Sequence, residues 1–132
     1  MGQVRIHSAE TIELKKIGER AGDPPPKIFS LLAKSELESS MAFHEFGGEK
    51  ELQLAEIDYV PGAEAVPHKH DDDEIIYVLS GEMHFGDKIL GPGSSVYIPG
   101  GTYYGFFAGP NGLRIVNFRA RADISFYLKT PS

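Results

Sequence analysis

From Ser40 onward, the chain consists of short apolar-rich runs separated by glycine- and proline-containing segments. The runs are MAFHEF, ELQLAEIDYV, EAVPHKH, EIIYVLSG, EMHFGDKIL, SSVYIP, TYYGFFA, LRIVNFRA and ISFYL. The separators include Gly47-Gly48, Pro61-Gly62, Gly81, Gly91-Pro92-Gly93 and Pro110-Asn111-Gly112. Roughly eight to ten strands at this spacing are typical of a β-sandwich or β-barrel formed in one piece. The sequence therefore predicts an all-β domain.

The length of 132 residues fits one domain with a single core. We expect residues 1–39 to form an N-terminal extended arm and the first strands, and residues 40–128 to form the barrel. Asp23 must be extended because a proline follows it. Ile28, Leu31 and Leu32 would share a helical face, but the run is short, and Lys27–Leu32 is interpreted as a strand.

The charge balance excludes several classes of partner. Thirteen basic residues against nineteen acidic ones give a net charge of −6, which disfavours nucleic acid and anionic membranes. The absence of cysteine excludes disulfides, thiolate catalysis and zinc–sulfur sites. The N-terminal sequence has no apolar signal region, and no run is long enough to span a bilayer. We therefore expect a cytoplasmic protein.

The run EIIYVLSG is apolar on both faces of its strand, since Ile76 and Val78 alternate with Ile75, Tyr77 and Leu79. A strand exposed on one face should alternate polar and apolar residues. Burial on both faces indicates that a second sheet or a partner subunit covers the outside of the barrel. A homodimer is the simplest solution.

The segment PHKHDDDE, residues 67–74, places two histidines and four acids close together. On a strand, His68 and His70 point to the same face and could chelate a divalent ion. If the strand that begins at Glu74 runs antiparallel, its carboxylate can reach the same ion. Two histidines and one carboxylate form the facial triad favoured by non-haem iron. The alternative is an exposed turn whose acids pair with Lys69.

The surrounding spacing resembles the cupin family. Gly62, five residues, His68-Lys69-His70, three residues, Glu74, six residues and Gly81 reproduce the first cupin motif, and Gly93, five residues, Pro99, one residue and Gly101 resemble the second. The two motifs and the strands between them cover residues 62–108. The resemblance implies a double-stranded β-helix (jelly-roll-like) barrel that holds a divalent transition metal (Mn, Fe, Ni or Zn). It also implies that His68, His70 and Glu74 are the metal ligands.

The second motif departs from the family at two positions. The family places a fourth ligand histidine where this chain has Tyr104, and an asparagine where it has Ala108. Tyr104 could ligate as a phenolate, although its unperturbed pKa near 10 opposes this. It could instead stay protonated beside a three-ligand metal and donate a hydrogen bond to water or substrate, or it could simply fill the barrel. The hydrogen-bonding role is favoured, because two histidines and a glutamate are already a sufficient ligand set.

The remaining histidines and the cavity wall are interpreted from strand parity. His84 is expected to point outward, and His44 and His7 have no spacing that recommends them as ligands. The residues expected to point inward are Val66, Ile76, Val78, Phe106, Ile57, Met83 and Phe85. Tyr59, Tyr77, Tyr97 and Tyr103 are placed within reach of the mouth. One of the arginines 114, 119 and 121 could turn inward to hold a carboxylate.

These features lead to three functional hypotheses. The first is a metal-dependent cupin enzyme that acts on a small organic molecule as a dioxygenase, decarboxylase, isomerase or cyclase, with the metal as Lewis acid. The second is a metal- or ligand-binding module without turnover. The third is a metal-free sugar epimerase or isomerase, with His68 or His70 as base and Tyr104 as acid.

Overall fold

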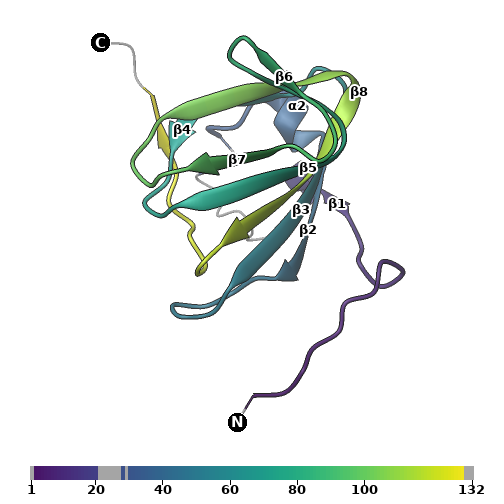
Figure 1. The fold of residues 1–132 in the computed structure, drawn as a ribbon, viewed down its shortest axis with the longest axis vertical. Coiled ribbons are helices and arrows are strands. Elements are labelled where there is room, and N and C mark those ends of the chain that lie inside the picture. The colour runs from purple at the N-terminus through teal and green to yellow at the C-terminus, as the bar shows by residue number, and fades with distance from the viewer. Residues whose placement is uncertain (1, 21–27, 29, 130–132) are drawn as a thin grey trace.

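A computed structural model of the chain describes residues 2–20, 28 and 30–129 (Figure 1). The described strands are β1 (Lys15–Lys16), β2 (Ser40–Glu45), β3 (Gln53–Tyr59), β4 (Glu64–Lys69), β5 (Glu74–Phe85), β6 (Lys88–Leu90), β7 (Ser95–Ile98), β8 (Tyr104–Arg119) and β9 (Tyr127–Leu128). The 3-10 helix η1 (Ile17–Glu19) and the α-helix α2 (Lys34–Leu37) precede β2. No helix in this part of the chain is long or apolar enough to cross a membrane.

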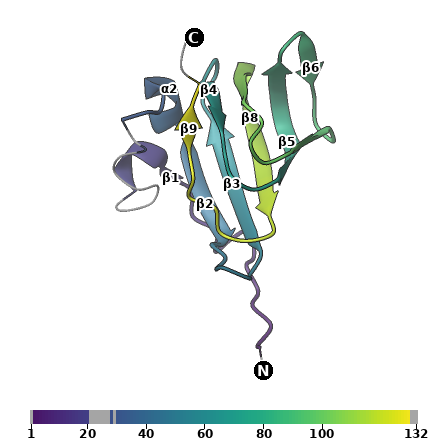
Figure 2. The same ribbon diagram turned by 90° about the vertical axis from the view of Figure 1, so that its left-hand side faces the viewer.

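The strands form one antiparallel sheet that is organised around β8. Its first residues pair with β4, and its second half pairs with β3 on one edge and β5 on the other. The sheet continues through β2 and β1 beyond β3, through β9 beyond β4, and through β6 and β7 beyond β5. The helix α2 packs against η1 and against the start of β4 (Figure 2). The predicted all-β, jelly-roll-like barrel is confirmed.

Two long strands replace four of the runs expected from the sequence. EIIYVLSG and EMHF belong to β5, and TYYGFFA and LRIVNFRA belong to β8. In the pairing of β5 with β8, Gly81 lies opposite Leu113 and Met83 lies opposite Ala108, so residues 109–112 bulge opposite a single residue. Such a bulge bends a strand without ending it. Gly81 and the segment Pro110-Asn111-Gly112, which separate apolar runs in the sequence, therefore lie within continuous strands.

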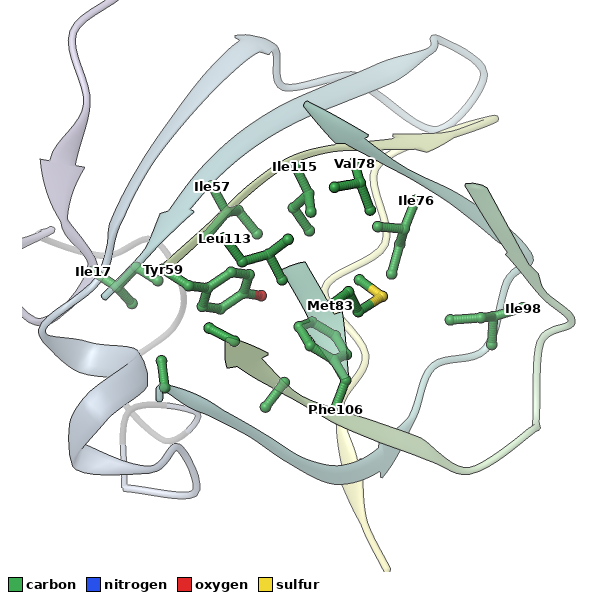
Figure 3. Packing of buried hydrophobic residues seen from close by; sticks show 13 residues of the cluster. Ile17, Ile57, Tyr59, Ile76, Val78, Met83, Ile98, Phe106, Leu113 and Ile115 are labelled. Atoms are coloured by element: carbon green, nitrogen blue, oxygen red, sulfur yellow. The ribbon is translucent and has the colours of Figure 1, made fainter. Parts of the chain in front are cut away.

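The core lies between the two halves of the sheet. Its largest fully buried side chains include Ile76, Val78, Met83, Leu113 and Ile115 (Figure 3). Tyr59 and Phe106 pack edge to face within the same cluster, with ring centroids 5.5 Å apart. The inward parity predicted for Ile57, Ile76, Val78, Met83 and Phe106 is confirmed by their burial, and Phe85 packs against the cluster.

The inward orientation predicted for Val66 is wrong. The register between β4 and β8 shifts between Ala65 and His68, so two residues lie between consecutive inward positions. Ala65 and His68 line the interior, whereas Val66 does not. The parity counted backwards from the histidines failed because a β-bulge adds one residue to the strand.

The strand predicted for Lys27–Leu32 is also wrong where the structure describes it. Ile28 has helical conformation, residues 30–32 form a turn and bend, and the Leu31 amide donates to the Ile28 carbonyl at 2.9 Å. Lys27 and Phe29 lie outside the described residues. Ile28 and Leu32 both face the interior cavity, so the helical spacing of the apolar residues decided the conformation.

The N-terminal arm, residues 2–14, extends away from the barrel (Figure 1). Arg5 and His7 contact Glu45 at the end of β2, with the His7 Nε2 atom 2.5 Å from the carboxylate. Val4 and Ile6 have the opposite parity and are almost fully exposed. The arm therefore presents apolar side chains to solvent.

Candidate functional site

The interior of the barrel contains a cavity of about 140 Å³. It is lined by η1, α2, β2, β3, β4, β5 and β8, and by residues 123–126 of the segment that leads to β9. Most of the wall is apolar, with Ile57, Ile76, Phe106 and Ile115 among its residues. His68, His70 and Tyr104 lie together on it, so the cavity contains three of the four side chains selected from the sequence.

The two histidines are held by backbone carbonyls through the same ring atom. The Nδ1 atom of His68 lies 2.5 Å from the Val66 carbonyl oxygen, and the Nδ1 atom of His70 bonds the Ser125 carbonyl oxygen. Because a carbonyl oxygen only accepts hydrogen bonds, each Nδ1 carries the proton, and each Nε2 keeps a free lone pair. Backbone carbonyls fix metal-binding histidines in this manner.

Burial keeps both histidines uncharged. It lowers the pKa of His68 to about 4, and it lowers the pKa of His70 together with the nearby Arg119 guanidinium. The two rings meet edge to face with centroids 4.8 Å apart. Two neutral imidazoles therefore lie side by side at neutral pH.

Glu74, the first residue of β5, is buried in a hydrogen-bonded ion pair. Its Oε2 atom accepts from Asn117 Nδ2 at 2.5 Å and from Arg119 Nη2 at 2.7 Å. Burial opposes ionisation, but the Arg119 guanidinium outweighs it and keeps the pKa of Glu74 below its usual range. The Oε1 atom is buried and has no hydrogen-bond partner of normal geometry, although the Tyr104 hydroxyl is near enough to affect the pKa.

Tyr104 opens β8 directly opposite His68 in the sheet register. Its ring centroid lies 4.5 Å from that of His68. Burial and the negative charge of Glu74 raise the pKa of Tyr104 well above its usual range. In this environment the phenol keeps its proton and can act as a hydrogen-bond donor.

The segment after β8 crosses beside the histidines. The Phe126 ring stacks on the His68 imidazole, with centroids 4.6 Å apart and planes 14° apart. Asp123 accepts a hydrogen bond from the Asp72 amide at 2.9 Å, and β9 pairs with the end of β4. Residues 123–128 therefore cover one side of the site.

The donor atoms fit a divalent transition metal in type but do not converge on one point. Two imidazole Nε2 atoms and the unpartnered Glu74 Oε1 match the ligand chemistry of such ions. Across residues 2–20, 28 and 30–129, however, no three His, Asp or Glu side chains are arranged to hold one ion. The Glu74 carboxylate is instead directed to Arg119.

Comparison with known proteins agrees with the fold and with the motif spacing. A family model described as a cupin domain matches residues 55–116. Residues 55–116 form a cupin domain, and the chain as a whole has the fold of the cupin structures that it matches.

Among solved structures, this cupin is similar to the polyketide cyclase RemF from Streptomyces resistomycificus, at 21% identity over 99% of this chain and 88% of that chain, with a TM-score of 0.69. It is similar to an RmlC-like cupin from Shewanella frigidimarina, at 22% identity over 89% of this chain and 92% of that chain, with a TM-score of 0.64. It is also similar to KdgF from a Halomonas species, at 27% identity over 63% and 79% of the two chains, with a TM-score of 0.54. No curated protein matches the sequence.

The sequence did not identify two polar residues of the site, Asn117 and Arg119. Arg119 is the arginine that turns inward, and the carboxylate that it holds is the protein's own Glu74. Asn117 was not singled out, although it follows the buried residues Leu113 and Ile115 at alternate positions of β8. Parity along LRIVNFR was the available signal, because it places 113, 115, 117 and 119 on one face.

Except for Tyr59, the other candidate histidines and tyrosines lie outside the cavity. His44 contacts Glu56 at 2.8 Å, and His84 lies 3.5 Å from Glu82, as the outward interpretation requires. Tyr59 lines the cavity, but Tyr77, Tyr97 and Tyr103 are exposed, which corrects their expected place near the mouth.

The acids of the bend do not pair with Lys69 as the alternative interpretation required. Asp72 pairs with Arg121 at 2.7 Å, and Asp73 accepts from the Gly100 amide at 2.8 Å. The Lys69 ammonium lies 4.9 Å from the ring centroid of Tyr103.

Proposed function

We propose that this cupin is a metal-dependent enzyme that acts on a small organic molecule bound in the barrel cavity. The observation that carries the proposal is the pair of neutral histidines, whose Nδ1 atoms are fixed by backbone carbonyls and whose Nε2 lone pairs are free. His68, His70 and Glu74 Oε1 would hold an Fe, Mn, Ni or Zn ion. When bound, that ion would supply Lewis-acid activation of a substrate oxygen.

The chain's own residues would bind and position the substrate. Tyr104, protonated beside Glu74, donates a hydrogen bond to a substrate oxygen. The apolar wall and the Phe126 ring exclude water, which strengthens polar interactions in the cavity. Dioxygenase, decarboxylase, isomerase and cyclase reactions are the candidates, and the apolar wall favours an uncharged substrate.

Metal analysis tests the proposal directly. We expect the protein purified without added metal to contain a transition metal in stoichiometric amount, and the His68→Gln and Glu74→Gln variants to lose it. The matched control is His84→Gln, which changes a histidine outside the cavity and should keep its metal. Metal measured by mass spectrometry at the same level in all four proteins would contradict the proposed ligand set.

A metal-free isomerase is the second candidate, because Arg119 already supplies a buried positive charge to Glu74. In that reaction His68 or His70 would act as base and Tyr104 as acid. Turnover that survives chelation and is lost in Tyr104→Phe would favour this candidate. Tight ligand binding without turnover would instead favour a binding module.

We also propose that the protein is a homodimer. The apolar side chains of Ile75, Tyr77 and Leu79 remain 40–43% exposed, so no second sheet of the described chain covers them. The sheet register places Tyr97 and Phe118 on either side of Ile75, which completes an outer apolar patch of these five residues. The arm with exposed Val4 and Ile6 extends away from its own barrel, and a second copy would bury both surfaces.

Light scattering should therefore give twice the mass of one chain. Tyr77→Glu places a charge in the outer apolar patch and should give the mass of a single chain. Ile89→Glu is the control, because Ile89 is more exposed than Tyr77 but lies on β6, outside the patch. A single-chain mass for the unmodified protein would refute the dimer.

A further inference from the structure

The end of the cavity away from the histidines contains an acidic side chain that the proposed chemistry does not use. Glu36 of α2 lines the cavity with Ile17, Ile28 and Leu32. No described residue forms a hydrogen bond with its carboxyl group. The residue is half-buried, and its carboxyl group beside these apolar side chains is available to form a hydrogen bond with a molecule that enters the cavity.

Glu36 lies near the start of β4, whereas the histidines lie at the end of that strand. The Ser35 hydroxyl beside Glu36 accepts from the Glu64 amide at 3.0 Å, which fixes α2 against the start of β4. His68 follows Glu64 by four residues, a distance of about 13 Å along a strand. The cavity therefore has two polar ends with an apolar wall between them.

The surroundings of Glu36 favour its uncharged form. Burial raises its pKa to about 8, and the negative charge of Glu64 adds to the effect. The other charged groups nearby are exposed to solvent: Lys34 of α2, Glu38 directly after α2, and Glu19 of η1, which packs against α2. At neutral pH the protonated carboxyl group can donate a hydrogen bond into the cavity.

The Tyr59 hydroxyl is a second polar group at the end of the cavity where Glu36 lies. Its ring points into the barrel interior (Figure 3), and the residue lines the cavity. Burial and then the charge of Glu36 raise the pKa of Tyr59, which identifies the two groups as neighbours. No described residue forms a hydrogen bond with this hydroxyl either.

We propose that the Glu36 carboxyl group is a specificity-determining group that donates a hydrogen bond to a carbonyl or hydroxyl oxygen of the substrate, at the end remote from His68 and His70. This inference rests on the proposed function only in taking the cavity as the substrate site. A cavity of about 140 Å³ has the size that accommodates one six-membered ring. The substrate class is therefore an uncharged, ring-sized molecule with oxygen atoms at both ends.

The probes are 1,4-cyclohexanedione, which has two opposite carbonyl groups, and cyclohexanone, which has one. In NMR titrations at pH 6.5, we expect the dione to bind the unmodified protein about five-fold more tightly than the monoketone, the effect of one additional neutral hydrogen bond. Glu36→Leu should remove this preference. Glu36→Gln should retain it, because an amide also donates, and Glu38→Gln on the exposed side of α2 should leave it unchanged.

The pH dependence distinguishes hydrogen-bond donation from a structural role. In the unmodified protein, the preference for the dione should decline as the pH rises through about 8, since the ionised carboxyl group no longer donates. In Glu36→Gln it should stay constant from pH 6.5 to pH 9. Equal preference in a folded Glu36→Leu variant would overturn the inference, and so would the same pH profile in the unmodified protein and in Glu36→Gln.

Failure here is separable from failure of the proposed function. Glu36→Leu should keep the metal content of the unmodified protein, because Glu36 is not among the proposed ligands. A protein without metal that still shows the Glu36-dependent preference would contradict the metal enzyme and support this inference. A protein that binds metal but shows no preference for the dione would support the metal enzyme and contradict this inference.

Discussion

Replacing Arg119 with methionine is expected to reduce the free energy of unfolding by about 3–5 kcal/mol, because the change leaves the Glu74 carboxylate charged and without its cation in the barrel interior. The side chains are 12% and 1% exposed for Arg119 and Glu74, so solvent cannot replace the lost partner. The substitution also removes the bond from Arg119 Nη1 to the Asp123 carbonyl oxygen at 2.9 Å. Urea unfolding in the presence of a chelator measures the effect on the metal-free protein.

Arg114 offers a matched control on the same strand. Its side chain is 40% exposed, and its partner Glu56, although only 11% exposed, also contacts His44 and would keep that partner. Arg114→Met should therefore cost no more than about 1 kcal/mol. Adding Glu74→Gln to Arg119→Met should recover part of the lost stability, since it removes the uncompensated charge. Similar losses for the two arginine variants would contradict the role assigned to the buried pair.

Substituting Gly81 with alanine is expected to have a comparably large effect, or to prevent folding. Gly81 has a φ of 77°, and a Cβ atom there would lie 2.2 Å from the carbonyl oxygen of Gly112. Because the clash is with the backbone of Gly112, β5 and β8 would have to separate beside the bulge at residues 109–112. Positive φ alone costs about 1–2 kcal/mol for a residue with a Cβ atom.

Gly86 separates the two contributions. It has a φ of 60°, but a Cβ atom there would meet nothing within 4 Å. Gly86→Ala should therefore show only the cost of the backbone conformation, and the difference from Gly81→Ala measures the clash. Thermal unfolding followed by circular dichroism is sufficient. Equal melting temperatures would show that the bulge can open without loss.

The first motif was recoverable from sequence because it depends on local geometry. His68 and His70 face the cavity, and Glu74 begins a strand, as spacing and parity predicted. Parity failed at Val66, where a bulge beside Pro67 adds a residue to the strand. The run Lys27–Leu32 was misassigned because short apolar segments satisfy helix and strand patterns alike.

The partners of the site residues were harder to predict, since they come from distant parts of the chain. Glu74 meets Arg119 across 45 positions, and His70 meets Ser125 across 55. Pairing at that range is set by the register of β8 and by the path of the last segment. Parity could have identified Asn117 and Arg119 as inward residues, but no pattern linked Phe126 or Glu36 to the cavity.

The contribution of residues 123–128 has a consequence for how the protein is synthesised. A ribosome completes β4 long before it adds Ser125, whose carbonyl oxygen orients the His70 ring. Domains generally fold as units, so the His70 ring gains its anchor only when this late part of the domain is in place. Completion of the cavity wall would then depend on residues 123–128, which the ribosome adds only after β1 to β8.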